Sequence, residues 1–352
     1  MQRQEDKINE EQQKIQQDDS QIQQITNQEI TPSNLKPFNY QLMEQNSIKQ
    51  DQFCYAIAVN KDCSILIAGC KEQIKVFEFN QAILKQLEIL SEHSKDVNTL
   101  NFLKRSDQFI SGSDDNLIII WARNPNNSWV CQQKLNGHTS YIMCLTLNNN
   151  EDVIASGDGD STIKLWYEQN EWLCKQTIKE HINRVLGLSF NEQQNKLISC
   201  GQDMLILVME QSELNKQWII IQKIELERQG IRLCFIDNST FTVQSWGYQY
   251  MHIFEMNSSN KLFSKTKDIP VKEGPECTQF PQQYIKSKCI LVNKNSSNVN
   301  LIRKQQNGEF TTEQTIEFGT HELFGCMTDD GQYLITWGTD SKEFQIREYK
   351  EQ

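Results

Sequence analysis

Three segments of the chain repeat one pattern of residues, and this repeat limits the possible folds more than any other feature of the sequence. They run from His93 to Trp121, from His138 to Trp166 and from His181 to Met209, and their first residues are 45 and 43 positions apart. Each contains an apolar strand, a polar turn, a second apolar strand with a Ser, a turn with an Asp, and a third strand. Short strands and turns with a period of about 40–45 residues predict the blades of a β-propeller.

The segment GHTSYIMCL…IASGDGDSTIKLW resembles a WD40 repeat, which carries a Gly-His pair, a strand with Ser and Gly, a turn Asp and a closing Trp. The resemblance covers roughly residues 38–352 and is specific in residues 93–209. It implies an all-β, seven-bladed propeller with four-stranded antiparallel blades, in which a hydrogen-bonded tetrad ties the strands of a blade together. Carried over to this sequence, the tetrads are His93, Ser111, Asp115 and Trp121; His138, Ser156, Asp160 and Trp166; and His181, Ser199 and Asp203, with Met209 in place of Trp.

The other blades match less well, but the length of the chain supports their number. From residue 38 onward the chain has 315 residues, which at about 45 residues per blade gives seven. Blade 1 ends at Phe77, blade 5 at Phe254, blade 6 spans about 271–316, and blade 7 has Asp340 in its turn. Residues 38–45 are expected to supply the outer strand of blade 7, which closes the ring and leaves no long free edge. The predicted propeller domain is 35–352.

Residues 1–34 are interpreted as a separate Gln-rich tail. The first 30 residues contain ten Gln and carry a net charge of −4. Ile8, Ile15 and Ile22 are spaced by seven residues, which allows a short coiled coil. Because the second apolar position of each heptad is largely missing, a solvated tail that is disordered or partly helical is the alternative.

Composition excludes several classes of function. The net charge is −11 and no basic run occurs, so neither nucleic acid nor an anionic membrane surface is expected as a partner. No stretch approaches the roughly 18 apolar residues of a membrane span. The 11 Cys are scattered without a CxxC pair, so we expect free thiols in a reducing compartment rather than a zinc or redox site. Together with the polar N-terminus, these features predict a cytoplasmic protein.

Residues that could carry chemistry have structural explanations. Three of the five His occupy the same place in the repeat, whereas a catalytic pair such as His138 with Asp160 has no reason to recur. The acidic pairs Asp114/Asp115, Asp158/Asp160 and Asp329/Asp330 lie in expected turns, where Asp favours tight backbone geometry. Gly157 and Gly159 are not followed by a helix and form no phosphate loop. We therefore predict no catalytic residue, cofactor, metal or small-molecule substrate. Trp246 is expected in the core with Trp121 and Trp166.

The resemblance also implies where partner proteins bind. In this family, contacts usually come from residues that flank the start of the first strand of a blade and from the residue before the turn Asp. These positions are Asp96, Asn98 and Asp114 in blade 2; Tyr141, Met143 and Gly159 in blade 3; and Arg184, Leu186 and Gln202 in blade 4. Tyr141, Met143, Arg184 and Leu186 resemble the aromatic, Met and Arg anchors of protein interfaces. The alternative is that some of them only line the channel wall.

The leading hypothesis is a non-catalytic scaffold that gathers proteins. One variant is an adaptor for cytosolic iron–sulfur protein assembly, because the outer strands NNSWVCQQKLNGH and QNEWLCKQTIKEH resemble those of the WD40 adaptor in the cluster-targeting complex. That adaptor binds partner proteins and holds no cluster. A second alternative is a substrate receptor of a ubiquitin ligase, although the Arg that such receptors often carry three residues after Trp-Asp is missing after Trp121 and Trp166. An enzyme would need a pocket in blades 5 to 7 that the sequence does not reveal.

Overall fold

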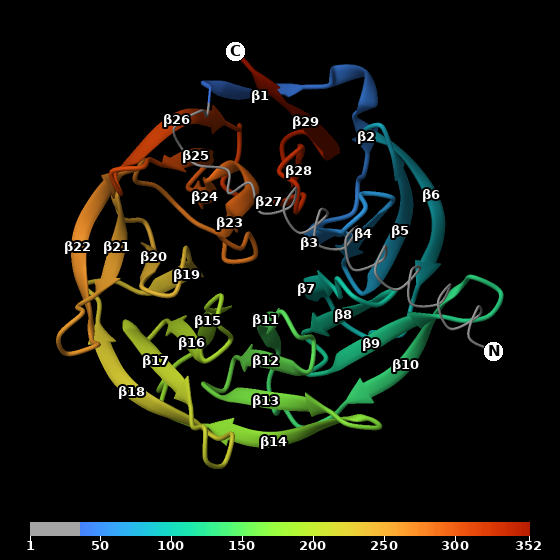
Figure 1. Cartoon of the computed structure of the whole chain (residues 1–352). Coiled ribbons are helices and arrows are strands. Elements are labelled where there is room, and N and C mark those ends of the chain that lie inside the picture. Colours follow the sequence, from blue (N-terminus) through green and yellow to red (C-terminus); the bar gives the residue numbers. More distant parts are fainter. Residues whose placement is uncertain (1–35) are drawn as a thin grey trace, which may run out of the picture. The chain divides into compact units, whose positions relative to one another are not determined.

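Seven sheets surround a central axis in the computed structural model, which describes residues 36–352 (Figure 1). Within a blade, each strand pairs antiparallel with the next, from the axis to the circumference. The predicted all-β, seven-bladed propeller with four-stranded antiparallel blades is therefore confirmed. The Gln-rich tail predicted for residues 1–34, with its two alternative interpretations, lies outside the described residues.

Blades 1 to 4 follow the chain in regular order. Blade 1 contains β3 (Cys54–Val59), β4 (Ile65–Cys70), β5 (Gln73–Asn80) and β6 (Ile83–Leu90), and blade 2 contains β7 (Val97–Phe102), β8 (Gln108–Ser113), β9 (Ile118–Arg123) and β10 (Trp129–Leu135). Blade 3 contains β11 (Ile142–Leu147), β12 (Val153–Asp158), β13 (Ile163–Glu168) and β14 (Trp172–Ile178), and blade 4 contains β15 (Val185–Phe190), β16 (Lys196–Gly201), β17 (Leu205–Gln211) and β18 (Trp218–Glu225).

The later blades keep the same order with local changes. Blade 5 contains β19 (Gly230–Phe235), β20 (Thr240–Ser245), β21 (Tyr250–Met256) and β22 (Phe263–Pro270), and blade 6 contains β23 (Gln283–Ile285), the short 3-10 helix η3 (Lys286–Lys288), β24 (Ile290–Asn295), β25 (Asn298–Lys304) and β26 (Phe310–Glu317). Blade 7 contains β27 (Leu323–Met327), β28 (Tyr333–Gly338) and β29 (Glu343–Glu351), together with β1 (Phe38–Leu42) and β2 (Ile48–Lys49), which flank the 3-10 helix η2 (Glu44–Asn46).

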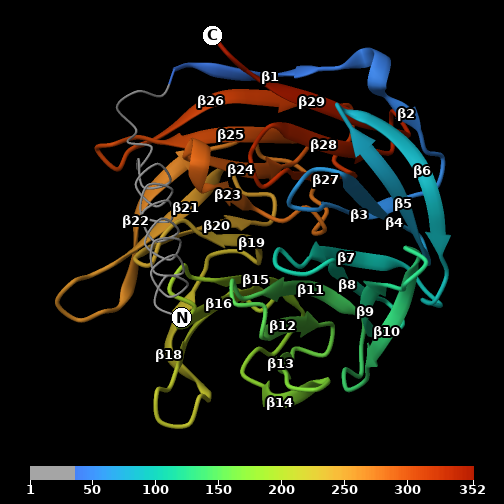
Figure 2. The same cartoon turned by 45° about the vertical axis from the view of Figure 1, so that its right-hand side comes forward.

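The ring is closed by the two ends of the propeller chain. Strand β1 pairs antiparallel with β29, from Phe38 opposite Glu351 to Leu42 opposite Arg347. Both views show β1 running alongside β29 at the circumference (Figure 2). This is the pairing expected from residues 38–45. It covers the edge that β29 would otherwise expose.

Burial explains why the strands of one blade differ in sequence. The middle strands have a neighbouring blade on each face, so both faces are buried and the sequence is a continuous apolar run, as in β4. The outer strands have one face in water and alternate, as in β10, where Trp129 and Leu135 are buried and Val130 is exposed.

A glutamine on the outer strand holds the next blade at four junctions. Gln176 of blade 3 donates from Nε2 to the Trp218 carbonyl (2.7 Å) and accepts from the Trp218 N–H (2.8 Å). Gln133, Gln222 and Gln314 make the same pair of bonds to Trp172, Phe263 and Tyr40. A side-chain amide fits this role because it carries both a donor and an acceptor.

One pair of cysteines departs from the sequence expectation. Cys54 and Cys70 lie directly opposite each other on β3 and β4, with 4.2 Å between their Cα atoms, and form a disulfide. The expectation of free thiols is therefore wrong for this pair, while the other nine cysteines are free. The two residues are 16 positions apart, and only the strand register brings them together.

Candidate functional site

Blades 2 and 4 contain a buried chain of hydrogen bonds around a histidine. In blade 2, His93 Nδ1 lies 2.9 Å from Asp115 Oδ2 and Nε2 lies 2.7 Å from Ser111 Oγ, while Trp121 Nε1 donates to the same hydroxyl at 2.8 Å. In blade 4, His181 contacts Asp203 and Ser199, both at 2.8 Å. Met209 is buried at the Trp position and supplies no donor.

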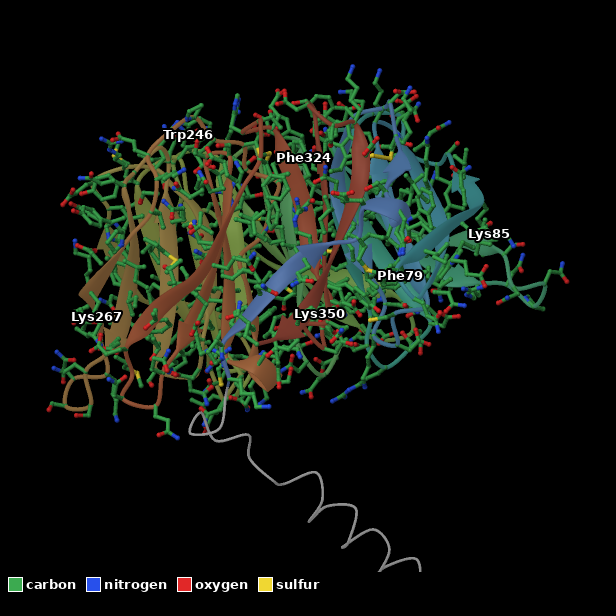
Figure 3. All side chains as sticks on the ribbon, turned by 90° about the horizontal axis from the view of Figure 1, so that it is seen from above. Phe79, Lys85, Trp246, Lys267, Phe324 and Lys350 are labelled. Atoms are coloured by element: carbon green, nitrogen blue, oxygen red, sulfur yellow. A yellow bond between two sulfur atoms is a disulfide. The ribbon has the colours of Figure 1, made fainter. Side chains whose placement is uncertain are left out.

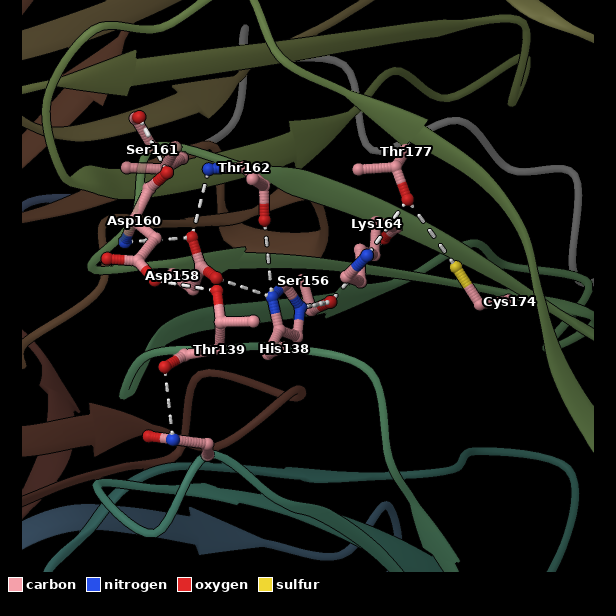
Figure 4. Close-up of polar contacts among 12 residues, drawn as sticks. His138, Thr139, Ser156, Asp158, Asp160, Ser161, Thr162, Lys164, Cys174 and Thr177 are labelled. Carbon is pink, nitrogen blue, oxygen red and sulfur yellow. Dashed lines mark hydrogen bonds and ion pairs between the residues drawn. The ribbon is translucent and has the colours of Figure 1, made fainter.

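Blade 3 uses a different aspartate from the one predicted. His138 Nδ1 lies 2.8 Å from Asp158 Oδ2 and Nε2 lies 2.6 Å from Ser156 Oγ, whereas Asp160 accepts a bond from the Thr139 hydroxyl at 2.6 Å (Figure 4). The prediction that Asp160 belongs to the tetrad is therefore wrong. The tetrad is His138, Ser156, Asp158 and Trp166, and Trp166 Nε1 donates to the Ser156 hydroxyl.

The physical reason is the side chain at the end of the second strand. Asp158 occupies the place that Ser113 has in blade 2, because each lies opposite the first residue of the inner strand. Its buried carboxylate also accepts the N–H groups of Asp160 and Thr162. A serine at this place cannot supply an anion to the imidazole, so blade 2 uses the later Asp115.

Electrostatics keeps the three carboxylates ionised. Burial by itself would raise the pKa of Asp115, but hydrogen bonds from His93 and the Ser94 N–H outweigh burial and lower that pKa to about 2. Burial opposes the shift for Asp158 and Asp203 as well, and hydrogen bonds from His138 and His181 lower both pKa values. In the arrangement that satisfies every partner, Trp donates to Ser, Ser to His, and His to Asp.

Eight of the residues predicted to contact partners line one cavity. The loops before the first strands and the turns between second and third strands lie at one side of the ring, which we call the top face. There, a cavity of about 400 Å³ is lined by Asp96, Asn98, Asp114, Tyr141, Met143, Arg184, Leu186 and Gln202, and by Tyr55, Trp246, Cys277, Thr278 and Gln279.

The position of Trp246 differs most from the one predicted from the sequence. It was expected in the core, but it follows β20 and its residue is 38% exposed. Its N–H donates to the Gln229 carbonyl (2.8 Å), just as the Asp114 N–H donates to Asp96 and the Gln202 N–H to Arg184. Figure 3 shows Trp246 at the upper edge of the propeller. The strand register places Trp246 where blade 2 has Asp114, but blade 5 lacks the His and Asp that mark this position in the sequence of blade 2.

The carboxylates and the arginine of the cavity lie on different blades. Asp96 and Asp114 lie on blade 2, and Asn98 donates to Asp114 at 2.6 Å. Burial, followed by the Asp96 carboxylate, raises the pKa of Tyr55 to about 12, so this phenol stays protonated. Tyr55 stands on β3 at the place of Asn98 on β7. Extending the repeat register to blade 1 would have found it.

An arginine and an aromatic ring occupy the side of blades 3 and 4. The Arg184 guanidinium carbon lies 5.2 Å from the centre of the Tyr141 ring, a cation–π arrangement. Gly159 is required beside this ring, because a Cβ there would come within 2.8 Å of two of its ring carbons. Gly159 thus gives Tyr141 its position and does not itself line the cavity.

An irregular segment between blades 5 and 6 completes the wall. Cys277, Thr278 and Gln279 belong to this segment, which precedes the three-residue strand β23. It is held by the fully buried Glu276, whose carboxylate contacts Arg232 (3.2 Å) and Lys294 (2.9 Å). No periodic signal in the sequence marks this wall.

Two exposed apolar side chains lie in the top-face loops of blade 4, outside the cavity lining. Ile182 is 84% exposed and Met204 is 44% exposed. Met204 also has a φ of 63°, a left-handed conformation that a residue with a long side chain adopts at a cost. On blade 5, the partly exposed Trp246 lines the cavity itself.

Two further findings concern the kind of site. Among residues 36–352, no group of three His, Cys, Asp or Glu side chains is placed to hold a metal ion. In the same part of the chain, no helix is long and apolar enough to cross a membrane.

Comparison with known proteins identifies the repeat. The family described as WD domain, G-beta repeat matches residues 84–122, 129–167 and 172–208. These ranges fall in the blades where the sequence pattern is clearest.

The similarity to known proteins covers only part of this chain. It is 28% identical over 120 residues to the probable coatomer subunit beta' of Schizosaccharomyces pombe, which is 33% of this chain and 14% of that protein. It is 35% identical over 108 residues to the U3 small nucleolar RNA-associated protein 15 homolog of Xenopus laevis, or 30% and 20% of the two chains. The WD repeat-containing protein 89 homolog of Dictyostelium discoideum is 24% identical over 234 residues, covering 66% and 60%. The first two matches thus span a fifth or less of each relative. The chain therefore contains WD40 repeats and folds into a seven-bladed β-propeller.

Proposed function

We propose that this chain is a non-catalytic scaffold whose top face binds an extended segment of a partner protein. The observation that carries the proposal is the cavity that collects eight of the nine residues deduced from the repeat. It also contains Tyr55 and the partly exposed Trp246, the kind of aromatic side chain that dominates binding energy at interfaces.

The lining suggests a partner segment with a basic residue next to an apolar one. The carboxylates of Asp96 and Asp114 would pair with a Lys or Arg of the partner beside the neutral Tyr55 ring. Trp246, Met143 and the exposed Met204 would cover the neighbouring apolar side chain. An acidic chain of net charge −11 favours the approach of such a basic segment.

The experiment is capture of partners from a cell extract, read by quantitative mass spectrometry. The full chain is compared with the variant Tyr141→Ala/Arg184→Ala/Trp246→Ala. The matched control is Leu214→Ala/Ile219→Ala, which removes apolar groups that are 100% and 51% exposed on blade 4 outside the cavity. We expect the triple variant to lose captured partners by about tenfold or more, and the control to keep them. Unchanged capture by the folded triple variant would contradict the proposal.

A second variant tests the chemistry of the partner. Asp96→Asn/Asp114→Asn keeps the size of both side chains and removes both charges. It should weaken capture and reduce the sensitivity of capture to salt, because a charge pair is lost. Capture that is equally strong and equally salt-dependent would exclude a basic partner segment at this place.

The same capture experiment separates the remaining proposals. Iron–sulfur assembly factors would support the adaptor variant, and ligase adaptors would support the receptor variant. The W-V-C and W-L-C segments behind the first variant also have a packing explanation, because Trp129 and Trp172 are buried at the start of outer strands. The cytoplasm is our proposed location, and microscopy of the tagged chain would test it.

A further inference from the structure

Blade 7 has the tetrad positions but not the histidine. Leu323 lies opposite Gly338 and Leu334 opposite Arg347, as Val97 lies opposite Ser113 and Phe109 opposite Trp121 in blade 2. Counting along these strands, the counterparts of His93, Ser111, Asp115 and Trp121 are Gly319, Thr336, Asp340 and Arg347. A donor, a hydroxyl and a carboxylate are present, and glycine stands at the place of the imidazole.

Arg347 is a buried charge at the base of this arrangement. The residue is 8% exposed, and its guanidinium carbon lies 4.6 Å from the centre of the Phe318 ring. It donates to Thr336 Oγ1 at 3.5 Å and to Gln345 Oε1 at 3.1 Å. Within residues 36–352, no carboxylate is paired with it, and burial lowers its pKa to about 10. A cation in this setting has hydrogen-bonding capacity that neutral partners meet only in part.

A cavity of about 180 Å³ lies beside Arg347. It is lined by Gly319, Asp340, Arg347 and Gln345, and also by Glu317, Phe318, Thr320, Gly338 and Ser341. The Asp340 carboxylate lies over Gly319, since a Cβ built on that glycine would collide with Asp340 Oδ2. The cavity is therefore bordered by the residues that stand at the places of His93, Asp115 and Trp121 of blade 2, namely Gly319, Asp340 and Arg347.

We propose that this cavity binds an imidazole ring supplied by another molecule. One ring nitrogen accepts a hydrogen bond from Arg347, and the N–H on the other side donates to Asp340. The bound ring completes the same chain of bonds that His93, His138 and His181 make within their own blades. The source is either a histidine side chain of a partner protein or a free imidazole-bearing molecule.

The charges favour a neutral, two-ended ring over an ion. An anion would meet Arg347 but also the carboxylates of Asp340 and Glu317, and a cation would meet the buried guanidinium. A neutral imidazole presents an acceptor at one nitrogen and a donor at the other. The acceptor nitrogen can face the Arg347 guanidinium, and the N–H can face the Asp340 carboxylate.

The test is a titration of the full chain with imidazole, followed by thermal unfolding and by saturation-transfer NMR on the imidazole ring protons. Wild type should show saturable transfer and a rise of about 1–3 °C in midpoint temperature. Gly319→His should lose both responses, because its own ring fills the cavity. The φ of Gly319 is not positive, and its Cβ would meet only the movable end of Asp340, so this variant should fold. Asp340→Ala, at an exposed position, is the second variant and should weaken binding about fivefold or more.

Variants of other blades make a negative result decisive. The variant His138→Gly opens a cavity of the same kind, so imidazole should raise its midpoint temperature and show saturable transfer. If that variant does not fold, His93→Gly or His181→Gly takes its place. If such a variant responds and wild type matches Gly319→His at every imidazole concentration, the inference is overturned. A short peptide with one histidine, compared with its alanine version, then distinguishes the sources. Binding of the peptide indicates a partner's side chain, and binding of imidazole alone indicates a small ligand.

Discussion

Blades 3 and 5 solve one packing problem in opposite ways. Blade 3 places His138, Ser156, Asp158 and Trp166 at the four tetrad positions, whereas blade 5 places Leu226, Val243, Ser245 and Phe254 at the matching positions. The first set is linked by hydrogen bonds, and the apolar side chains of the second pack into one cluster. The polar network pairs its buried groups, whereas the apolar cluster leaves the buried hydroxyl of Ser245 without a hydrogen-bond partner, which costs free energy.

The largest expected effect comes from breaking the polar set. His138→Ala leaves the fully buried Asp158 carboxylate without its main partner, so we expect a loss of about 3 kcal/mol in the free energy of unfolding. Urea unfolding measures it. Asp160→Ala is the matched control, because the Asp160 carboxylate accepts only the hydroxyl of the exposed Thr139, so this change should cost less than about 1 kcal/mol. Equal losses of unfolding free energy in the two variants would contradict the assignment of Asp158, rather than Asp160, to the tetrad.

The reverse change breaks the apolar set. Val243→Ser puts a hydroxyl at the place that Ser156 has in blade 3, among Phe241, Phe254 and other buried apolar groups. No imidazole or indole is there to bond it, so we expect a loss of about 2 kcal/mol, also by urea unfolding. Val243→Ala is the control, since it removes a similar volume without adding a polar group. A serine variant as stable as the alanine variant would contradict this, because it would show that the apolar cluster accepts another unpaired hydroxyl without loss of stability.

Acid should separate the two kinds of blade. The pKa of Asp115 is lowered to about 2 in the fold, below the value of about 3.9 for an unfolded Asp. Its contribution is therefore present above about pH 4 and is lost as the pH falls toward 2. We expect this carboxylate to contribute about 2 kcal/mol to the pH dependence. Urea unfolding from pH 6 to pH 2 measures it, and Asp115→Asn should flatten the curve, while Asp51→Asn at an exposed surface position should not.

The sequence predicts the repeated blades well because their pattern depends on strand burial. The run IIIW of β9 and the alternation WVCQQKL of β10 indicate a middle and an outer strand without further information. The choice of Asp158 over Asp160 depends on which side chain reaches His138, which spacing does not determine. Trp246 and the wall at Cys277 depend on where β20 ends and on the buried contacts of Glu276. These come from tertiary packing, and the local pattern does not contain them.

The junctions between blades show the same contrast on a smaller scale. Gln176 both donates to and accepts from Trp218, but Glu88 of blade 1, at the equivalent place, only accepts the Trp129 N–H at 3.3 Å. A carboxylate cannot donate to the Trp129 carbonyl, so this junction has one bond fewer. Glu88→Gln should therefore raise the free energy of unfolding by about 0.5–1 kcal/mol. The mirror variant Gln176→Glu should lower it by a similar amount. Urea unfolding near pH 7 measures both variants. If the free energy of unfolding changed in the same direction in both, the missing donor would not be what weakens the junction at Glu88.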